Sequence, residues 1–314
     1  MKILYTGNLK EDHRHDLLSD FPQVDLVSTA NESIMDIEIC DSDIFISWGR
    51  FITPERIARG KNLKWVHALS TGVDKFLIPE IISSDMLLSN SRGIHKEQIS
   101  EHVFSFLLPY VRRQFDYRKM QKRKEWEHLT ISGLANKTIG IVGLGSIGEE
   151  IAKKAKVFDM TVVATKKNPT NSIFVDKMYS SKELNKILPM VDFLVLIVPL
   201  TDETQNLIGE KELSLMKKSA FLVNMARGGV VDEKALYKAL IDNEIAGAGL
   251  DVFSKEPLPQ DSPLWELDNC YITPHVGGVS PDYTKKAMAL FKENLQAYIS
   301  GKELPTKVDK HKGY

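Results

Sequence analysis

Residues 138–158 read as a buried strand, a glycine-rich turn and a helix in direct succession. Residues 139–142 are mostly apolar and β-branched, which is typical of a parallel strand covered on both faces. The first glycine of such a turn permits a tight bend, the second lets a pyrophosphate approach the backbone, and the third lets helix and strand pack closely. Free N–H groups at the helix start then bind the phosphates. This order predicts a dinucleotide site at Gly143-Leu144-Gly145-Ser146-Ile147-Gly148.

Short apolar runs alternate with helical patterns along the rest of the chain, which predicts open parallel α/β sheets. A Thr-Pro-Glu sequence at Thr53 predicts a capped helix over 53–59. The expected strands lie at residues 3–5, 43–47, 65–69, 86–90, 161–164, 193–198, 220–224, 246–250 and 270–273. A final helix is expected over 281–299.

A long helix is expected over residues 96–124, apolar in its first half and basic in its second. The basic half of this helix has two interpretations. A nucleic-acid surface is disfavoured because the 314-residue chain has a formal net charge of −1. A solvated helix end, at a contact between subunits, is the better interpretation.

Composition narrows the class of protein further. A hydrophobic content of 43% and a charged content of 26% are those of a soluble globular protein. Cys40 and Cys270 lack the spacing of metal ligands, so we expect no metal site, and free thiols in a reducing compartment are a simpler explanation than one disulfide. The N-terminus has no long apolar core and no run approaches the length of a membrane helix, so we expect a cytoplasmic protein that binds no membrane.

Polar side chains stand where several expected strands end, and the carboxyl ends of parallel strands share one sheet edge. Arg227, beside two glycines, is either a surface residue or a fork for a planar carboxylate. His275 is either structural or an acid/base, since histidine ionises near neutral pH. Glu256 is either simply solvated or the partner that orients His275 and favours its protonated form.

Together these motifs resemble the D-isomer-specific 2-hydroxyacid dehydrogenase family over nearly the whole chain. The resemblance rests on the glycine turn, Val198-Pro199-Leu200-Thr201 with Thr204, Asn224-Met225-Ala226-Arg227-Gly228, Gly249-Leu250-Asp251-Val252-Phe253 with Glu256-Pro257, and Thr273-Pro274-His275. It implies two doubly wound, Rossmann-like domains, with a dinucleotide-binding domain at 101–280 inserted in a flavodoxin-like substrate domain at 1–100 and 281–314.

The resemblance also implies roles for individual residues. Arg227 would bind the substrate carboxylate and carbonyl, with His275 as the acid/base paired with Glu256. The loop at Thr71, Gly72 and Val73 would offer N–H groups to the substrate carboxylate. Cofactor contacts are implied at Gly143, Gly145, Ser146, Ile147, Gly148, Thr165, Lys166, Lys167, Val198, Pro199, Thr204, Met225, Ala226, Asp251 (beside the nicotinamide amide) and His275.

The end of the strand expected over 161–164, the second strand of the dinucleotide-binding domain, indicates which nicotinamide cofactor the chain prefers. NAD enzymes usually place Asp or Glu there to hold the ribose hydroxyls. Here the chain reads Thr165-Lys166-Lys167, which suits the 2′-phosphate of NADP and resembles NADP-preferring glyoxylate/hydroxypyruvate reductases. The alternative is that both lysines are solvated and the enzyme uses NAD loosely.

A small 2-keto acid such as glyoxylate or hydroxypyruvate is the expected substrate, reduced to the D-2-hydroxy acid. The segments 93–95 and 99–102 and the ending Lys312-Gly313-Tyr314 give a softer resemblance to the same branch. Trp48 and Arg50 are either an apolar wall and a second anion contact or ordinary surface residues. A bulkier keto acid with NADH, or a nucleotide-sensing scaffold with little catalysis, stays open, and phosphite oxidation is a distant option.

Two other enzyme classes of this superfamily are disfavoured as the function of this chain. Formate dehydrogenases carry Gln where Glu256 stands, and a long phosphoglycerate dehydrogenase would add a regulatory domain after the last helix. The resemblance also suggests a homodimer formed through residues 100–124.

Overall fold

A computed structural model describes residues 1–313, and Tyr314, the last residue of the C-terminal resemblance, lies outside the described residues. The chain divides into two compact units, Met1–Ile94 with Ser280–Tyr314 and His95–Val279, so the second is inserted in the first. These boundaries fall six residues and one residue before the expected 100/101 and 280/281. Each unit is described by itself.

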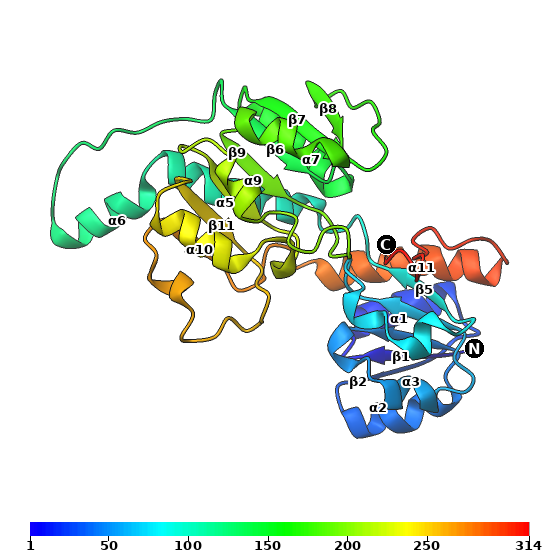
Figure 1. Ribbon diagram of the computed structural model, residues 1–314. Helices are drawn as coiled ribbons and strands as arrows, with labels where there is room; N and C mark the ends of the chain where they lie inside the picture. The colour runs from blue at the N-terminus through cyan, green and yellow to red at the C-terminus, as the bar shows by residue number, and fades with distance from the viewer. Residues whose placement is uncertain (314) are drawn as a thin grey trace. The chain divides into compact units, whose positions relative to one another are not determined.

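The first unit is a five-stranded parallel sheet in the order β2-β1-β3-β4-β5. Figure 1 labels β1, β2 and β5 of this sheet. Helices α1 and α11 pack on one face, where Leu17 and Phe291 are buried, and α2, α3 and α4 pack on the other, where Met35 and Ile57 are buried. The elements are β1 (Lys2–Thr6), α1 (Glu11–Asp20), β2 (Asp25–Thr29), α2 (Glu32–Glu38), β3 (Ile44–Ser47), α3 (Pro54–Arg59), β4 (Trp65–Ala68), α4 (Pro79–Ile82), β5 (Leu87–Asn90) and α11 (Tyr283–Ile299).

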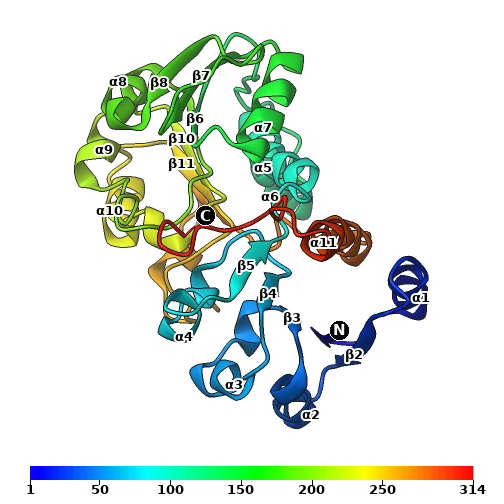
Figure 2. The ribbon, with the colours of Figure 1, turned by 90° about the vertical axis from the view of Figure 1, so that its right-hand side faces the viewer.

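The second unit is a seven-stranded parallel sheet in the order β12-β11-β10-β9-β6-β7-β8. Figure 2 shows α5 and α7 on one side of this sheet and α8, α9 and α10 on the other. The elements are α5 (Lys96–Val111), α6 (Gln114–Arg123), β6 (Thr138–Val142), α7 (Ser146–Val157), β7 (Thr161–Lys166), β8 (Lys177–Ser180), α8 (Leu184–Ile187), β9 (Phe193–Leu196), α9 (Glu210–Ser214), β10 (Phe221–Asn224), α10 (Glu233–Ile241), β11 (Gly247–Leu250) and β12 (Cys270–Ile272).

Most of the predicted elements are confirmed, including the two doubly wound parallel sheets. Helix α3 begins as predicted, because the Thr53 side chain accepts a hydrogen bond from the Arg56 N–H and Pro54 occupies the first turn. Two strands were not predicted, β2 and β8. Both lie at sheet edges, where a strand pairs with only one neighbour and is less buried. Its sequence therefore need not be a continuous apolar run.

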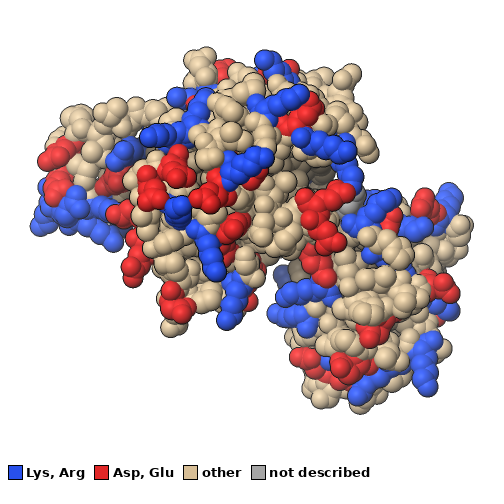
Figure 3. All heavy atoms as spheres, viewed as in Figure 1, with Lys and Arg blue, Asp and Glu red and all other residues tan. Residues whose placement is uncertain are grey.

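The single helix predicted over 96–124 is wrong, because the structure forms two helices there. Arg113 adopts a left-handed backbone with φ of 53° between α5 and α6, four residues after Pro109, which lies inside α5. A residue in this conformation cannot continue a right-handed helix. The break separates the buried, apolar α5 from the polar α6, whose Lys and Arg side chains gather with Asp and Glu beside them (Figure 3). Among residues 1–313, no helix is both long and apolar enough to cross a bilayer.

Candidate active site

The glycine turn between β6 and α7 has the geometry that the sequence predicts for it. Gly143 adopts φ of 103°, and a Cβ there would lie 2.7 Å from the Ile197 carbonyl oxygen. A Cβ at Gly148 would lie 2.7 Å from the Gly143 carbonyl oxygen, whereas a Cβ at Gly145 would meet no atom within 4 Å. Gly143 and Gly148 are therefore required by close packing of the backbone, whereas Gly145 leaves open space beside the backbone.

That open space adjoins the N-terminus of α7, a helix of 12 residues whose N-cap is Gly145. The first N–H groups of a helix have no partner within the helix. Within residues 1–313, no hydrogen bond from the Ser146 or Ile147 N–H is found. An exposed helix start with open space at its cap fits the pyrophosphate of a dinucleotide.

The strand beside β6 ends in basic residues, as predicted. Thr165 is buried, and the Lys166 Nζ donates to the Thr170 hydroxyl at 3.0 Å. The Lys167 Nζ lies 2.9 Å from Oε2 and 3.1 Å from Oε1 of Glu203. Glu203 was not singled out in the sequence, although it stands inside the Thr201–Thr204 motif.

The turn after β10 presents Arg227. The Asn224 side chain bridges this turn, because its Oδ1 accepts from the Ala226 N–H at 3.0 Å and its Nδ2 donates to the Arg227 carbonyl at 3.1 Å. The next residue, Gly228, packs so closely that a Cβ there would lie 1.8 Å from the Phe253 carbonyl carbon. The backbone around Arg227 is thus fixed on both sides, and the residue stays partly exposed.

His275 and Glu256 form a pair at the same sheet edge. The His275 Nδ1 lies 2.8 Å from the Glu256 Oε2, and the Glu256 Oε1 accepts from the Phe253 N–H at 3.0 Å. An imidazole whose Nδ1–H donates to the carboxylate leaves its Nε2 for proton exchange, and the carboxylate stabilises the charge of the protonated ring. Since β10, β11 and β12 are parallel neighbours, Arg227, Asp251 and His275 all follow strands at one edge. The glycine turn follows β6 at that edge too.

Asp251 holds the backbone that bears His275. Its Oδ1 accepts from the Thr273 hydroxyl at 2.5 Å and the Val276 N–H at 2.9 Å, and its Oδ2 accepts from the Gly277 N–H at 2.8 Å. The His102 Nε2 lies 2.9 Å from the same Thr273 hydroxyl. Asp251 is buried, so the structure gives it a positioning task that the sequence did not reveal. His102 and Thr273 were likewise missed as functional side chains.

The other residues predicted to contact the cofactor line the neighbouring loops. The Thr204 hydroxyl donates to the Pro199 carbonyl at 2.6 Å and accepts from the Thr201 N–H at 2.8 Å, so it shapes the loop after β9. Val198 is partly buried and Pro199 exposed on this loop. Met225 and Ala226 are buried between β10 and Arg227.

In the first unit, the loops after β3 and β4 are neighbours, because these strands pair in parallel. The Asn90 Nδ2 donates to the Thr71 carbonyl at 2.7 Å, and the Ser70 carbonyl accepts from the Ser91 N–H at 3.1 Å. Gly72 is partly exposed and Val73 is buried. The loop at 70–73 is therefore held from β5, and Asn90 is a further residue whose role the sequence did not indicate.

Trp48 and Arg50 lie on the loop after β3. The Trp48 indole stacks on the Tyr283 ring with centroids 5.3 Å apart. The Arg50 guanidinium lies over the Phe51 ring, 4.6 Å from its centroid. Trp48 is thus part of the packing against α11, whereas Arg50 is exposed.

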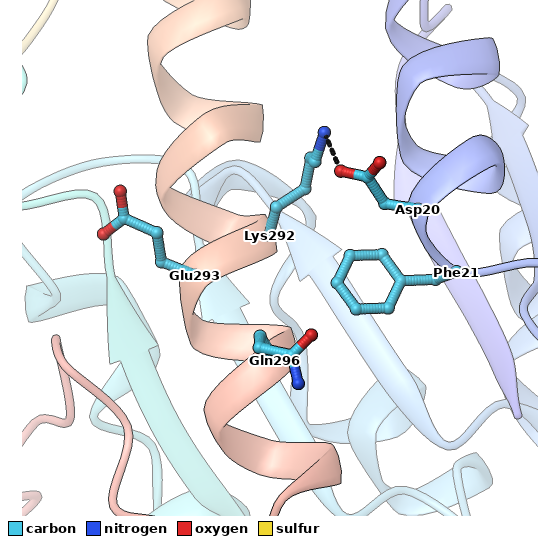
Figure 4. Close-up of a pocket in the computed structure, with 5 residues that line it drawn as sticks. All are labelled: Asp20, Phe21, Lys292, Glu293 and Gln296. Atoms are coloured by element: carbon cyan, nitrogen blue, oxygen red, sulfur yellow. Dashed lines mark ion pairs between the residues drawn. The ribbon is translucent and has the colours of Figure 1, made fainter.

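A separate surface depression lies between α1 and α11. Figure 4 shows its lining residues, Asp20, Phe21, Lys292, Glu293 and Gln296. The Lys292 Nζ lies 2.9 Å from an Asp16 carboxylate oxygen and 2.5 Å from one of Asp20. Two carboxylates already outnumber its single positive charge, so this charge does not favour an anion in the depression.

The sequence of the chain is similar to known proteins over most of its length. Residues 104–277 match the family model described as the D-isomer specific 2-hydroxyacid dehydrogenase, NAD binding domain. The chain is 33% identical over 313 residues to a glyoxylate reductase of Pyrococcus horikoshii, covering 97% of this chain and 88% of that protein. It is 32% identical over 308 residues to a D-3-phosphoglycerate dehydrogenase of Methanocaldococcus jannaschii, covering 96% of this chain and 58% of that protein.

A solved structure is similar to this chain in fold as well. The NADPH-dependent glyoxylate/hydroxypyruvate reductase of Sinorhizobium meliloti, in complex with NADP and sulfate, superposes with a TM-score of 0.88 at 26% identity. The match covers 100% of this chain and 99% of the other. The chain therefore belongs to the D-isomer-specific 2-hydroxyacid dehydrogenase family.

Proposed function

We propose that this chain reduces a small 2-keto acid, of the glyoxylate or hydroxypyruvate type, to the D-2-hydroxy acid with NADPH. The observation that supports this most directly is the 2.8 Å pair of His275 and Glu256, at the sheet edge that also bears Arg227 and the glycine turn. Two of the relatives named above, a glyoxylate reductase and an NADP-bound glyoxylate/hydroxypyruvate reductase, support the choice of substrate and cofactor.

The proposed chemistry follows from where charge develops. Bound NADPH supplies the hydride that adds to C2 of the keto acid. Negative charge then grows on the carbonyl oxygen, and the Arg227 guanidinium stabilises it there more than in the ground state. The Nε2–H of protonated His275 donates its proton to this oxygen, while Glu256 holds the ring through Nδ1 and balances its charge.

Three further assignments are supported by the family resemblance together with local geometry. The backbone N–H groups around Thr71, Gly72 and Val73 are assigned to the substrate carboxylate, and the Asn90 contact to Thr71 supports a fixed loop there. Trp48 and Arg50 are assigned to the substrate side, where exposed Arg50 is the better candidate for an anion contact. The second unit is assigned to the dinucleotide and the first to the substrate.

A second copy of this chain is the partner we assign to the surface of α5 and α6. Trp126, which follows α6, is 94% exposed, and Phe115 on α6 is 39% exposed. Large exposed aromatic side chains are typical of surfaces that pack against another protein. The molar mass in solution, measured by light scattering, tests this assignment. For the compartment we infer the cytoplasm, because both cysteines are free.

The decisive experiment is a panel of 2-keto acids, from glyoxylate to branched and aromatic ones, with NADPH or NADH. Oxidation of the nicotinamide is followed by absorbance. We expect glyoxylate or hydroxypyruvate with NADPH to give the highest kcat/KM. Binding of NADPH without turnover of any acid would instead favour a nucleotide-sensing scaffold.

His275→Ala tests the acid/base assignment in the same assay. Loss of a general acid is expected to lower kcat by roughly 10²- to 10⁴-fold while the Kd for NADPH stays near that of the wild type. His128→Ala, at an exposed histidine of the same unit, is the control. Turnover of His275→Ala at the wild-type rate would contradict the assignment.

A further inference from the structure

The two lysines at the end of β7 do not by themselves determine how strongly the site would select NADPH over NADH. Strand β7 ends in Thr165 and Lys166 and is followed by Lys167, with no carboxylate for the ribose hydroxyls of NAD. Lysine binds a phosphate as a point charge, so its strength depends on which other charges lie nearby. The charged residues next to Lys167 in the sequence do not include the one that affects it most, because the strand order brings a residue from another loop close to it.

That loop follows β9. In the sheet, β6 lies between β7 and β9, so the loops after β7 and β9 leave the carboxyl edge on the two sides of the glycine turn. Glu203, on the β9 loop, reaches Lys167 on the β7 loop, with both carboxylate oxygens within 3.1 Å of Nζ. The pair thus connects the two loops that flank the predicted pyrophosphate site.

The position of Glu203 is set by its own loop. The Thr204 hydroxyl donates to the Pro199 carbonyl and accepts the Thr201 N–H, which closes a turn around residues 199–204. The side chains of Lys167 and Glu203 are 58% and 73% exposed, so both charges are accessible to a ligand.

We infer that Glu203 determines how strongly this chain discriminates between NADPH and NADH. Its carboxylate competes with the 2′-phosphate for Lys167 and repels that phosphate. The same carboxylate can accept a hydrogen bond from the 2′-hydroxyl of NADH, the task that a strand-end Asp or Glu performs in other dinucleotide sites. Glu203 therefore weakens the selectivity for NADPH that Lys166 and Lys167 create. The inference rests on the proposed function, because it concerns the same dinucleotide site.

The test measures binding directly, without substrate. Titration of the full-length protein with NADPH, NADH and 2′,5′-ADP gives a Kd for each by calorimetry. For Glu203→Gln we expect the ratio of the NADH to the NADPH dissociation constant to rise by about fivefold at low salt, since exposed charge pairs contribute only fractions of a kcal/mol to about 1 kcal/mol. The rise should shrink at high salt because exposed charges are screened.

The chain offers a matched control. Glu210 and Lys238 form another pair at 2.9 Å, with side chains 73% and 60% exposed, on α9 and α10. Glu210→Gln removes the same charge from a pair of the same 2.9 Å separation and similar exposure, and should leave the ratio unchanged. In a Lys167→Gln background, Glu203→Gln should have a smaller effect on NADPH, because only the competition for Lys167 is then absent and the direct repulsion of the 2′-phosphate remains.

The outcomes separate this inference from the proposed function. If the wild type binds NADPH but Glu203→Gln and Glu210→Gln have the same ratio, the inference is wrong and the proposed function stands. If the wild type binds neither dinucleotide nor 2′,5′-ADP, both are wrong. A ratio that rises for Glu203→Gln but not for Glu210→Gln, and rises less when Lys167 is replaced, supports the inference.

Discussion

His67 is a buried histidine whose protonation should limit the stability of the first unit in mild acid. It lies in β4 with no exposed surface, and burial lowers the pKa of its imidazole from 6.5 to about 3. Its Nδ1 lies 2.7 Å from the Ser89 hydroxyl, which also accepts from the Trp65 Nε1–H at 2.8 Å. Its Nε2 lies 3.3 Å from the Ser91 hydroxyl. The neutral ring is thus satisfied without any carboxylate.

The sign and size of the effect follow from linkage. Between pH 6.5 and about 3, the unfolded chain holds a proton on His67 and the folded chain does not. Unfolding therefore takes up a proton, and the free energy of unfolding falls as the pH drops below 6.5. One pKa unit corresponds to about 1.4 kcal/mol, so His67 should remove about 2 kcal/mol at pH 5 relative to pH 7.

Urea unfolding of the full chain at pH 7 and pH 5, followed by tryptophan fluorescence, checks this value, because Trp65 is fully buried and should respond strongly. His67→Asn keeps a polar contact in place of Nδ1 and cannot take up the proton. This variant loses some stability at pH 7, because its smaller side chain leaves a cavity, but its loss between pH 7 and pH 5 should be about 2 kcal/mol smaller than that of the wild type. His15→Asn, at an exposed histidine of the same unit, is the control. Equal losses in the wild type and His67→Asn would refute the reasoning.

Two further predictions concern the second unit. Gly145→Ala should weaken NADPH binding without lowering the melting temperature, because its Cβ meets no protein atom, whereas Gly143→Ala should cost at least about 1–2 kcal/mol of stability because of its φ of 103°; equal stability losses in the two variants would contradict this. Asp251→Asn should lower the free energy of unfolding by about 1.5–3 kcal/mol, because one of the oxygens that accept from Val276, Gly277 and Thr273 becomes a donor. Denaturant unfolding measures that loss, and an unchanged stability would show that the carboxylate does not hold the loop that bears His275.

Local patterns in the sequence determined much of this protein. The order of strand, glycine turn and helix at 138–158 is readable because two of its requirements are local, the φ of 103° at Gly143 and the close approach of Gly148 to the Gly143 carbonyl. The central strands are readable because both of their faces are buried, which demands continuous apolar runs. The polar residues after β10, β11 and β12 could be assigned to one edge because parallel strands share their carboxyl ends.

Tertiary structure decided what depends on neighbours remote in sequence. Edge strands β2 and β8 form because β1 and β7 offer them hydrogen bonds, although their own sequences are only partly apolar. Asp251 reads as a cofactor residue in the sequence, and only folding shows its oxygens committed to Thr273, Val276 and Gly277. Lys167 reads as a phosphate ligand until the strand order places Glu203 beside it, since the free energy of a charge depends on the charges that the fold brings near it.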